Sequence, residues 1–538
     1  MAPRHGKIVT FLMALMLIMN STIAVLATPI AQPEAGVPWW RTTICYEVFV
    51  RSFQDSDGDG IGDINGLISR LDYLNDGTPG SGDDLGVGCI WLMPIMQSPS
   101  YHGYDVTDYR TIEADYGTNA DFLRLMEEAH SRGIRVIVDY PLNHISVEHE
   151  WFIDAASDPA SPYRDWFIFE EEDPGYPGPW GQQVWHRNPY GDGYYYGIFD
   201  SSMPDLNFRN DEVNAEFRDI TEFWLTSMGV DGFRMDAIKH VIEEGKIQEN
   251  TPETIAWLRE FAGFVKGVNP EAFTIGEVMG TGTDSLQAYY PDTLDAFFHF
   301  EMAGTLRNAA STASPRRIGP IVNGADSRLP DQRWGTFLTN HDEPRVATVL
   351  KQDQDKLRVA AMLLLTLPGT PFIYYGEEIG LPGEKPDPNI RTPMQWSGED
   401  GGGFTTGTPY TAMQPGWQML NVGAQDGDAN SLLNAYRTWG HLRETSIALQ
   451  QGTFVPLETE DRQVFAFLRV HENETMLVVI NLGSEQSEPI TLTLPDGAPG
   501  SLINALTGEA LPGSVVGDSV IIPAVPARDG VAFVVGAP

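Results

Sequence analysis

The chain has 538 residues, of which 42% are hydrophobic and 20% charged, and its formal net charge is −40. This length and composition are those of a globular protein with a large core and more than one domain. Because so negative a chain repels phosphates, the charge argues against nucleic acid as a partner. It also disfavours anionic membrane surfaces and acidic substrates.

The N-terminal segment has the pattern of a secretion signal. A basic start that includes Arg4 and Lys7 precedes an apolar run over 8–27, in which Val25 and Ala27 fit a small-residue cleavage site. The alternative is an uncleaved anchor, because the run nearly spans a bilayer. We predict a signal peptide over residues 1–27. We therefore expect a secreted protein, extracellular or periplasmic. After cleavage of the signal peptide we expect no stable association with a membrane.

Eight short apolar runs, rich in Val, Ile and Phe, lack strict alternation, as parallel strands buried on both faces do. Helical patterns lie between them, for example 119–132, which begins at the cap-forming residue type Asn119, and 214–228. This repetition predicts an α/β fold, a (β/α)8 TIM barrel formed by 28–140 and 208–447. The eight runs are 45–53, 88–95, 133–140, 230–237, 272–279, 293–302, 334–342 and 370–379.

Two further regions depart from the barrel pattern. Residues 141–207 are too long for a plain connection and rich in Trp and Tyr, so we predict a small domain inserted after the third strand. Residues 448–538 hold short β-rich runs separated by turn residues, which predict a C-terminal antiparallel β-sandwich.

Cys45 and Cys89 are the only cysteines, so the chain has no disulfide framework. Both lie in predicted core strands, and we expect two buried free thiols. A single disulfide is the alternative if the two strands are neighbours.

Polar residues gather where the predicted strands end, which is where barrel enzymes place their catalytic groups. Each has a structural explanation when taken alone, such as a local ion pair between Arg234 and Asp236. Several acids, an arginine and histidines on one rim are costly to bury unless function requires them. The residues are Asp139, Asn143, His144, Arg234, Asp236, Lys239, His240, Glu277, Asn340, His341 and Asp342.

Such a set of carboxyl groups suits glycoside cleavage, in which one carboxylate attacks the anomeric carbon and a protonated acid serves the leaving oxygen. Neighbouring carboxylates would raise the pKa of that acid. Metal-assisted hydrolysis is the weaker reading, because no HxxxH or HxH spacing occurs.

Six segments follow one another in the order GDINGL (62–67), DYPLNH (139–144), MPDLN (203–207), GFRMDAIKH (232–240), GEVMG (276–280) and FLTNHD (337–342). They resemble ordered segments of the α-amylase family, glycoside hydrolase family 13, and the resemblance covers about residues 40–535. MPDLN is similar to the group intermediate between oligo-1,6-glucosidases and neopullulanases, and RTPMQW (391–396) to the oligo-1,6-glucosidase side. The resemblance implies a barrel, a domain inserted after strand three and a C-terminal β-sandwich.

The resemblance also implies roles for individual residues. Asp236 would be the nucleophile, and Glu277 the general acid and then base. Asp342 would form hydrogen bonds with sugar hydroxyl groups and stabilise the distorted ring. Arg234 would bind in the same site and keep Asp236 ionised, within a retaining double displacement. Substrate-binding roles are likewise implied for His102, Tyr104, His144, Lys239, His240 and His341.

Three features favour an endo-acting α-amylase that cleaves α-1,4 bonds in starch and maltooligosaccharides, with transglycosylation as a side activity. Ala237 follows the nucleophile where α-1,6-specific relatives tend to carry Val, and Lys239-His240 resembles an amylase pair. Tyr101 stands where oligoglucosidases tend to carry an acid that blocks the chain end. The alternatives are an exo-acting α-glucosidase or oligo-1,6-glucosidase-like enzyme, and a catalytically dead binding or transporter-associated relative. We expect a monomer.

The stretch DSDGDGIGD, residues 55–63, begins like an EF-hand loop. The sensor reading fails because the twelfth position is Gly66 rather than Glu, and because a strand rather than a helix precedes the loop. The alternative is a solvated acidic turn that binds no metal. The family resemblance places a structural calcium ion here and implies Asn143 as a ligand of a second one. The implied ligands of the first are Asp55, Asp57, Asp59, the Ile61 carbonyl and Asp63.

Overall fold

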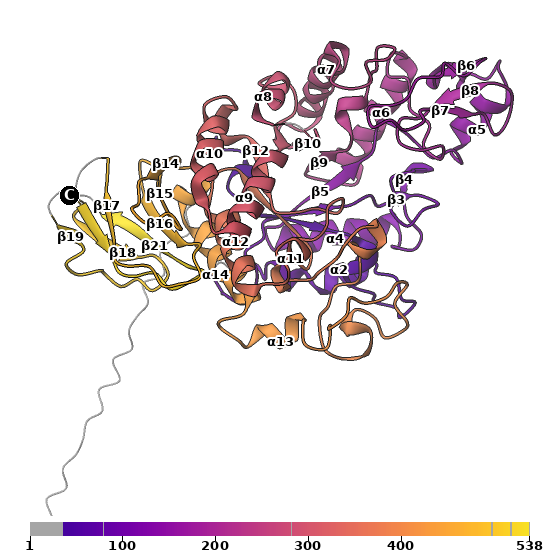
Figure 1. The fold of residues 1–538 in the computed structure, drawn as a ribbon. Helices are drawn as coiled ribbons and strands as arrows, with labels where there is room; N and C mark the ends of the chain where they lie inside the picture. Colours follow the sequence, from indigo (N-terminus) through magenta and orange to yellow (C-terminus); the bar gives the residue numbers. More distant parts are fainter. Residues whose placement is uncertain (1–35, 79, 281, 496–498, 517–518, 537–538) are drawn as a thin grey trace, which may run out of the picture.

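Eight parallel strands close into a barrel in the computed structural model (Figure 1), which describes residues 36–536 apart from 79, 281, 496–498 and 517–518. The predicted signal peptide lies outside the described residues. Within the described part of the chain, no helix is both long and apolar enough to cross a membrane.

The barrel confirms the predicted fold class, and each of the eight predicted runs contains one barrel strand, shorter than the run. The strands follow one another around the barrel in the order β1, β2, β5, β9, β10, β11, β12 and β13, with β13 pairing back to β1. Their side chains are buried almost throughout, so the interior is a packed core. The bounds are β1 Cys45–Val48, β2 Cys89–Leu92, β5 Arg135–Tyr140, β9 Gly232–Met235, β10 Phe273–Gly276, β11 Ala296–Phe298, β12 Trp334–Phe337 and β13 Thr370–Tyr374.

Helices between the strands cover the outside of the barrel (Figure 1). The predicted helix 119–132 is α4, but its N-cap is Thr118, which is extended and forms a capping box with Asp121. The helix predicted over 214–228 begins earlier, after the cap Asn210, and continues as a π-helical turn over 223–227. The α-helices are α1 Val50–Phe53, α2 Ile64–Ser69, α3 Leu71–Leu74, α4 Asn119–Ser131, α5 Glu150–Ser157, α6 Asp211–Glu222, α7 Pro252–Val268, α8 Thr283–Leu286, α9 Phe300–Thr312, α10 Ile318–Asp326, α11 Val346–Val349, α12 Gln354–Thr366, α13 Val422–Asp426, α14 Leu432–Thr445 and α15 Ile447–Gln451.

The long connection between β5 and α6 forms a separate lobe at one end of the molecule (Figure 1). It holds α5 and a three-stranded antiparallel sheet in the order β6, β8, β7, with bounds Phe169–Glu170, Tyr194–Tyr196 and Trp185–Arg187. Trp185 and Tyr196 belong to its small apolar cluster, which explains the aromatic composition of this segment. A second small sheet pairs β3, Met96–Gln97, with β4, Asp108–Ile112.

The C-terminal region folds into two antiparallel sheets with apolar side chains between them. The five-stranded sheet has the order β14, β15, β16, β21, β18, and the three-stranded sheet the order β17, β20, β19. The bounds are β14 Thr453–Leu457, β15 Val464–Val470, β16 Thr475–Asn481, β17 Ile490–Thr493, β18 Ser501–Asn504, β19 Val515–Val516, β20 Ser519–Ile522 and β21 Asp529–Gly536.

Two buried arginines bind backbone carbonyls at and after the end of α12, and one of them, Arg469, comes from the C-terminal region. Arg469 on β15 donates to the backbone carbonyls of Thr366, the last residue of α12, and of Gly452. Arg443 on α14 donates to the carbonyls of Leu365, Leu367 and Gly369. Burial lowers the pKa of both guanidinium groups, that of Arg443 to about 9. Together they satisfy the Leu365 and Thr366 carbonyls, which lie at the end of α12 and have no helical partner.

The expectation of two free thiols is wrong, because Cys45 and Cys89 form a disulfide. The residues face each other in register on the neighbouring parallel strands β1 and β2, with their Cα atoms 4.3 Å apart. The apolar runs alone did not establish that these two strands pair at this register.

Candidate active site

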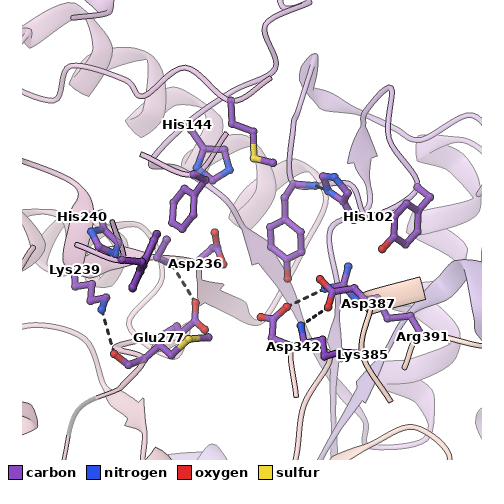
Figure 2. Close-up of a pocket in the computed structure, with 17 residues that line it drawn as sticks. His102, His144, Asp236, Lys239, His240, Glu277, Asp342, Lys385, Asp387 and Arg391 are labelled. Carbon is purple, nitrogen blue, oxygen red and sulfur yellow. Dashed lines mark hydrogen bonds and ion pairs between the residues drawn. The ribbon is translucent and has the colours of Figure 1, made fainter. Parts of the chain in front are cut away.

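A pocket of about 450 Å³ opens at the carboxyl ends of the barrel strands and collects most of the predicted site residues (Figure 2). Its volume is in the range of small-molecule sites. Arg234 and His341 lie beneath it, fully buried. The predicted residues that line the pocket are His102, Tyr104, His144, Asp236, Lys239, His240, Glu277 and Asp342.

Arg234 on β9 connects three carboxyl groups at the floor of the pocket. Its Nη1 lies 2.5 Å from Asp236 Oδ1 and 2.9 Å from Asp139 Oδ1, and its Nη2 lies 2.9 Å from Glu277 Oε2. In low-dielectric surroundings, charge-assisted hydrogen bonds of this kind fix both geometry and charge. The acids at the ends of β5, β9 and β10 therefore form one unit around one guanidinium.

The backbone next to Asp236 is also specialised. Ala237 has φ of 50°, in the left-handed region that costs a non-glycine residue energy, and its N–H donates to Glu277 Oε2 at 3.4 Å. Such strain tends to occur at functional sites. The turn directs this N–H toward Glu277 rather than into a continuing strand.

Glu277 is held in a state suited to giving up a proton. Burial raises its pKa to about 7, against the opposing charge of Arg234 and with the help of Asp236 and Asp342. Its Oε1 is buried and has no hydrogen-bond partner among the described residues. The carboxyl group can therefore be protonated near neutral pH, with one oxygen free to meet an incoming group.

Asp342 lies across the pocket in the opposite electrostatic setting. Its carboxylate pairs with His341 Nε2 at 3.1 Å and with Arg391 Nη2 at 2.9 Å. Burial would raise the pKa of Asp342, but His341 and Arg391 outweigh burial and lower it. Two carboxyl groups that face one pocket are thus driven to opposite protonation states.

The remaining predicted residues lie around these acids. The hydroxyl group of Tyr104 is 2.6 Å from His341 Nε2, and burial lowers the pKa of His102, His144 and His240, that of His240 to about 4. Neutral imidazoles can both donate to and accept from hydroxyl groups. Lys239 Nζ pairs with Glu249 Oε2 at 2.8 Å and donates to the Met279 carbonyl at 3.2 Å.

Several lining residues were not predicted. Trp180 in the inserted lobe, 56% exposed, lies with its ring 5.4 Å from that of His240, on the Glu277 side of the pocket. Lys385, Asp387 and Arg391 form a chain of ion pairs on the Asp342 side (Figure 2). Of these residues, only Arg391, the first residue of RTPMQW, lies in a motif that the sequence analysis identified. Loop residues follow no periodic pattern that would link them to the site.

The acidic loop 55–63 lies outside the pocket. Asp55, Asp57 and Asp63 each place a carboxylate oxygen within 4.8 Å of the others. Asp59 is not in this group, and its Oδ1 accepts the Ile61 N–H. The loop is tied to a distant segment, since Thr405 donates its hydroxyl to Asp55 and the Tyr410 N–H donates to the Gly60 carbonyl.

Asn143, the residue expected at a second calcium site, donates its amide to Asp205 Oδ2 at 3.1 Å. Burial raises the pKa of Asp205 well above its usual value. Among the described residues, the one group of three or more acids, cysteines or histidines able to share an ion is in the 55–63 loop. The second calcium site at Asn143 stays a prediction.

The chain is similar to known proteins along most of its length. A family described as "Alpha amylase, catalytic domain" matches residues 47–452, and one described as "Maltogenic Amylase, C-terminal domain" matches residues 454–519. The chain is 39% identical over 453 residues to Alpha-amylase 3 of Dictyoglomus thermophilum, which covers 83% of this chain and 85% of that protein. It is 31% identical over 520 residues to an oligo-1,6-glucosidase of Heyndrickxia coagulans, with 82% and 92% covered. The crystal structure of an α-amylase from H. orenii has a TM-score of 0.83 and 38% identity, and covers 92% of this chain and 99% of that one.

Proposed function

Because this chain belongs to the α-amylase family, glycoside hydrolase family 13, we propose that it is an endo-acting α-amylase. The bonds cleaved are α-1,4-glucosidic bonds in starch and maltooligosaccharides, with retention of anomeric configuration. Relatives named α-amylase and oligo-1,6-glucosidase both match, in keeping with the intermediate position that MPDLN indicates. The observation that carries the proposal is the contrast between Glu277, which can be protonated near neutral pH, and the carboxylate of Asp236 paired with Arg234.

In the first step, a carboxylate oxygen of Asp236 attacks the anomeric carbon while the glycosidic C–O bond breaks. Glu277 gives its proton to the departing oxygen and becomes a carboxylate. In the second step, Glu277 takes a proton from water, whose oxygen replaces Asp236 on the anomeric carbon. A sugar hydroxyl group in place of water gives transglycosylation.

Arg234 supports both steps from below the pocket. Its contacts with Asp236 and Glu277 keep the two carboxyl groups near each other, an arrangement that suits direct attack by the second carboxylate. The aromatic ring of Tyr104 offers a face to the apolar side of a sugar ring. His102, His144 and Asp342 supply hydrogen-bonding groups around that ring.

A maltoheptaoside blocked at its non-reducing end tests the mode of action. An endo enzyme cuts it inside the chain. During starch digestion by such an enzyme, the number of reducing ends rises before glucose accumulates. We expect short maltooligosaccharides as first products, measured by chromatography, with the unblocked heptaoside as the control. Reaction of the unblocked chain alone would replace endo with exo action, and release of no reducing sugar from either would overturn the glucan-hydrolase proposal.

One observation favours exo action as the second candidate. The ion pairs among Lys385, Asp387 and Arg391 border the pocket on the Asp342 side, and the Arg391 guanidinium lies 6.0 Å from the centre of the Tyr101 ring. A charged wall at this end would admit the end of a glucan chain and block a chain that continues past the site. The blocked substrate distinguishes these two modes directly.

Secretion is part of the proposal. It is supported by the signal-like pattern of residues 1–27 and by the Cys45–Cys89 disulfide, because disulfides persist mainly in oxidising compartments.

We further propose that the 55–63 loop binds calcium. Three carboxylates close together suit a hard cation that takes oxygen ligands, and none of the ion pairs among the described residues neutralises them. Asp55, Asp57 and Asp63 would hold the ion, with Asp59 and the Ile61 carbonyl as the remaining predicted ligands. The ion would relieve the mutual repulsion of the acids and stiffen the loop, away from the bond that is cleaved.

Removal of calcium with EGTA should lower the melting temperature by a few degrees. Saturation at 100 times Kd contributes about 2.7 kcal/mol to the folded state, and each kcal/mol moves Tm by a few degrees at most in a chain of this size. Calorimetry with and without added calcium measures the change. Asp57→Asn should abolish the calcium response, whereas the exposed Asp83→Asn serves as the matched control. An unchanged Tm for the native protein after chelation would contradict the proposal.

A further inference from the structure

Glu47 is a fully buried carboxylate on the first barrel strand that no part of the proposed reaction uses. It lies on β1 between Trp91 of β2 and Tyr374 of β13, its register neighbours. Its Oε1 lies 2.5 Å from His341 Nδ1, and the His341 side chain is completely buried. An acid in the barrel core is costly unless it is paired, so this contact accounts for its presence there.

The other side of the His341 ring faces the pocket. Nε2 lies 2.6 Å from the hydroxyl group of Tyr104 and 3.1 Å from Asp342 Oδ2. The Tyr104 hydroxyl group in turn donates to Asp139 Oδ2 at 3.0 Å. One imidazole thus stands between a buried acid behind the site and two residues that line it.

Counting donors assigns the charge of this ring. Nδ1 faces the carboxylate of Glu47, so it must carry a hydrogen. Tyr104 has one hydroxyl hydrogen, which it gives to Asp139, so toward His341 it can only accept. Nε2 faces this acceptor and the Asp342 carboxylate, and must carry a hydrogen as well. With both nitrogens protonated, His341 is an imidazolium.

The electrostatics agree with this count. Burial alone would lower the pKa of His341, but Asp342 and Glu47 raise it to about 10. The charge of His341 in turn lowers the pKa of Asp342. The ring is also fixed in place by edge-on contact with Trp91 at 5.5 Å. The charged or titratable groups around this pair are Tyr104, Asp139, Arg234, Glu277, Asp342, Tyr374, Glu377 and Arg391.

We propose that Glu47 is a positioning residue of the reaction: its carboxylate holds His341 as an imidazolium, and His341 holds Asp342 and Tyr104 in their places against the sugar. The kinetic part of this inference rests on the proposed function. The charge assignment does not, because it can be measured in the protein without substrate.

The Glu47→Gln variant tests the proposal, because glutamine keeps the size of the side chain and removes its charge. The chain has 11 histidines, which can be labelled with ¹⁵N. In the native protein at pH 7, the His341 ring should show the two buried N–H signals of an imidazolium. Glu47→Gln should lose one of them, and His341→Gln assigns the pair. On maltoheptaose we expect kcat to fall roughly 10- to 100-fold, the range found when the hydrogen-bond partner of a metal-ligating histidine is removed, with little change in KM.

Two further variants separate positioning from a general loss of packing. Glu378→Gln removes another fully buried glutamate, which accepts from Tyr46 and Tyr73 and not from His341. It should leave the imidazolium signals intact. Glu47→Asp keeps the charge and should keep both signals and recover part of kcat.

A neutral His341 ring in the native protein overturns the proposal, as does a Glu47→Gln variant with unchanged signals and unchanged kcat. An equal effect of Glu378→Gln on the signals overturns it as well. Loss of the signal in Glu47→Gln alone supports the charge assignment whichever sugar the enzyme cleaves, so its outcome is separate from that of the glucan-hydrolase proposal.

Discussion

Asp236→Asn should lower kcat on starch by at least roughly 10⁴-fold, a loss typical of removing a catalytic nucleophile. The amide is a poor nucleophile and cannot form the glycosyl–enzyme bond. It also replaces the carboxylate that pairs with Arg234 Nη1 at 2.5 Å, so one contact of the buried guanidinium is weakened. Arg234 keeps its bonds to Asp139 and Glu277, and we therefore expect the variant to fold.

Reducing-sugar release measures the loss, and circular dichroism confirms the fold. Asp219→Asn makes the same chemical change at an exposed position of α6 and should retain full activity. Starch cleavage by Asp236→Asn within tenfold of the native rate would show that another group attacks the sugar.

Glu277→Gln should lower kcat/KM on maltooligosaccharides by about 10²- to 10⁴-fold, the usual contribution of general acid catalysis. The effect depends on the leaving group, because fluoride departs without a proton. Maltosyl fluoride should therefore form the glycosyl–enzyme intermediate at a much less impaired rate than a maltooligosaccharide does.

The same variant carries a pH signature. In the native enzyme kcat/KM should fall as pH rises through about 7, since Glu277 then loses the proton that the leaving oxygen requires. Glu277→Gln should lack this alkaline limb in its residual activity on maltooligosaccharides, whose leaving oxygen requires a proton. Glu243→Gln is the matched control, because burial also raises the pKa of Glu243 to about 7 and it lies outside the pocket. Persistence of the alkaline limb in Glu277→Gln would assign the proton to another group.

The barrel was predictable because parallel strands buried on both faces leave long apolar runs in the sequence. The ends of those runs also located Asp236, Glu277 and Asp342, because every parallel strand delivers its final residues to the same rim. Strand bounds were overestimated, since apolar residues continue beyond the hydrogen-bonded ladder into the loops, as in 293–302, where β11 covers three residues.

The residues that were missed reach the site in ways that local patterns do not encode. Glu47 lies within an apolar strand and contacts a residue 294 positions away. Lys385 and Asp387 come from a loop with no repeating pattern, and Trp180 was one of thirteen tryptophans with nothing to distinguish it. The pairing of Cys45 with Cys89 depended on strand register, which is set by the closed barrel. Long-range placement, rather than local propensity, separates these residues from those that were found.

The contacts that Arg469 of the C-terminal region makes with the barrel have a consequence for protein engineering. Sequence similarity divides the chain between residues 452 and 454, which suggests two exchangeable modules. Yet Arg469, from beyond that division, supplies hydrogen bonds to Thr366 and Gly452 on the barrel side. A barrel truncated at this division would lose the Arg469 hydrogen bond to the Thr366 carbonyl, whereas the Gly452 carbonyl would keep its bond from Gln332 Nε2. Grafting a sugar-binding or anchoring module onto this enzyme should therefore begin after the C-terminal sheets, leaving the 452–453 junction intact.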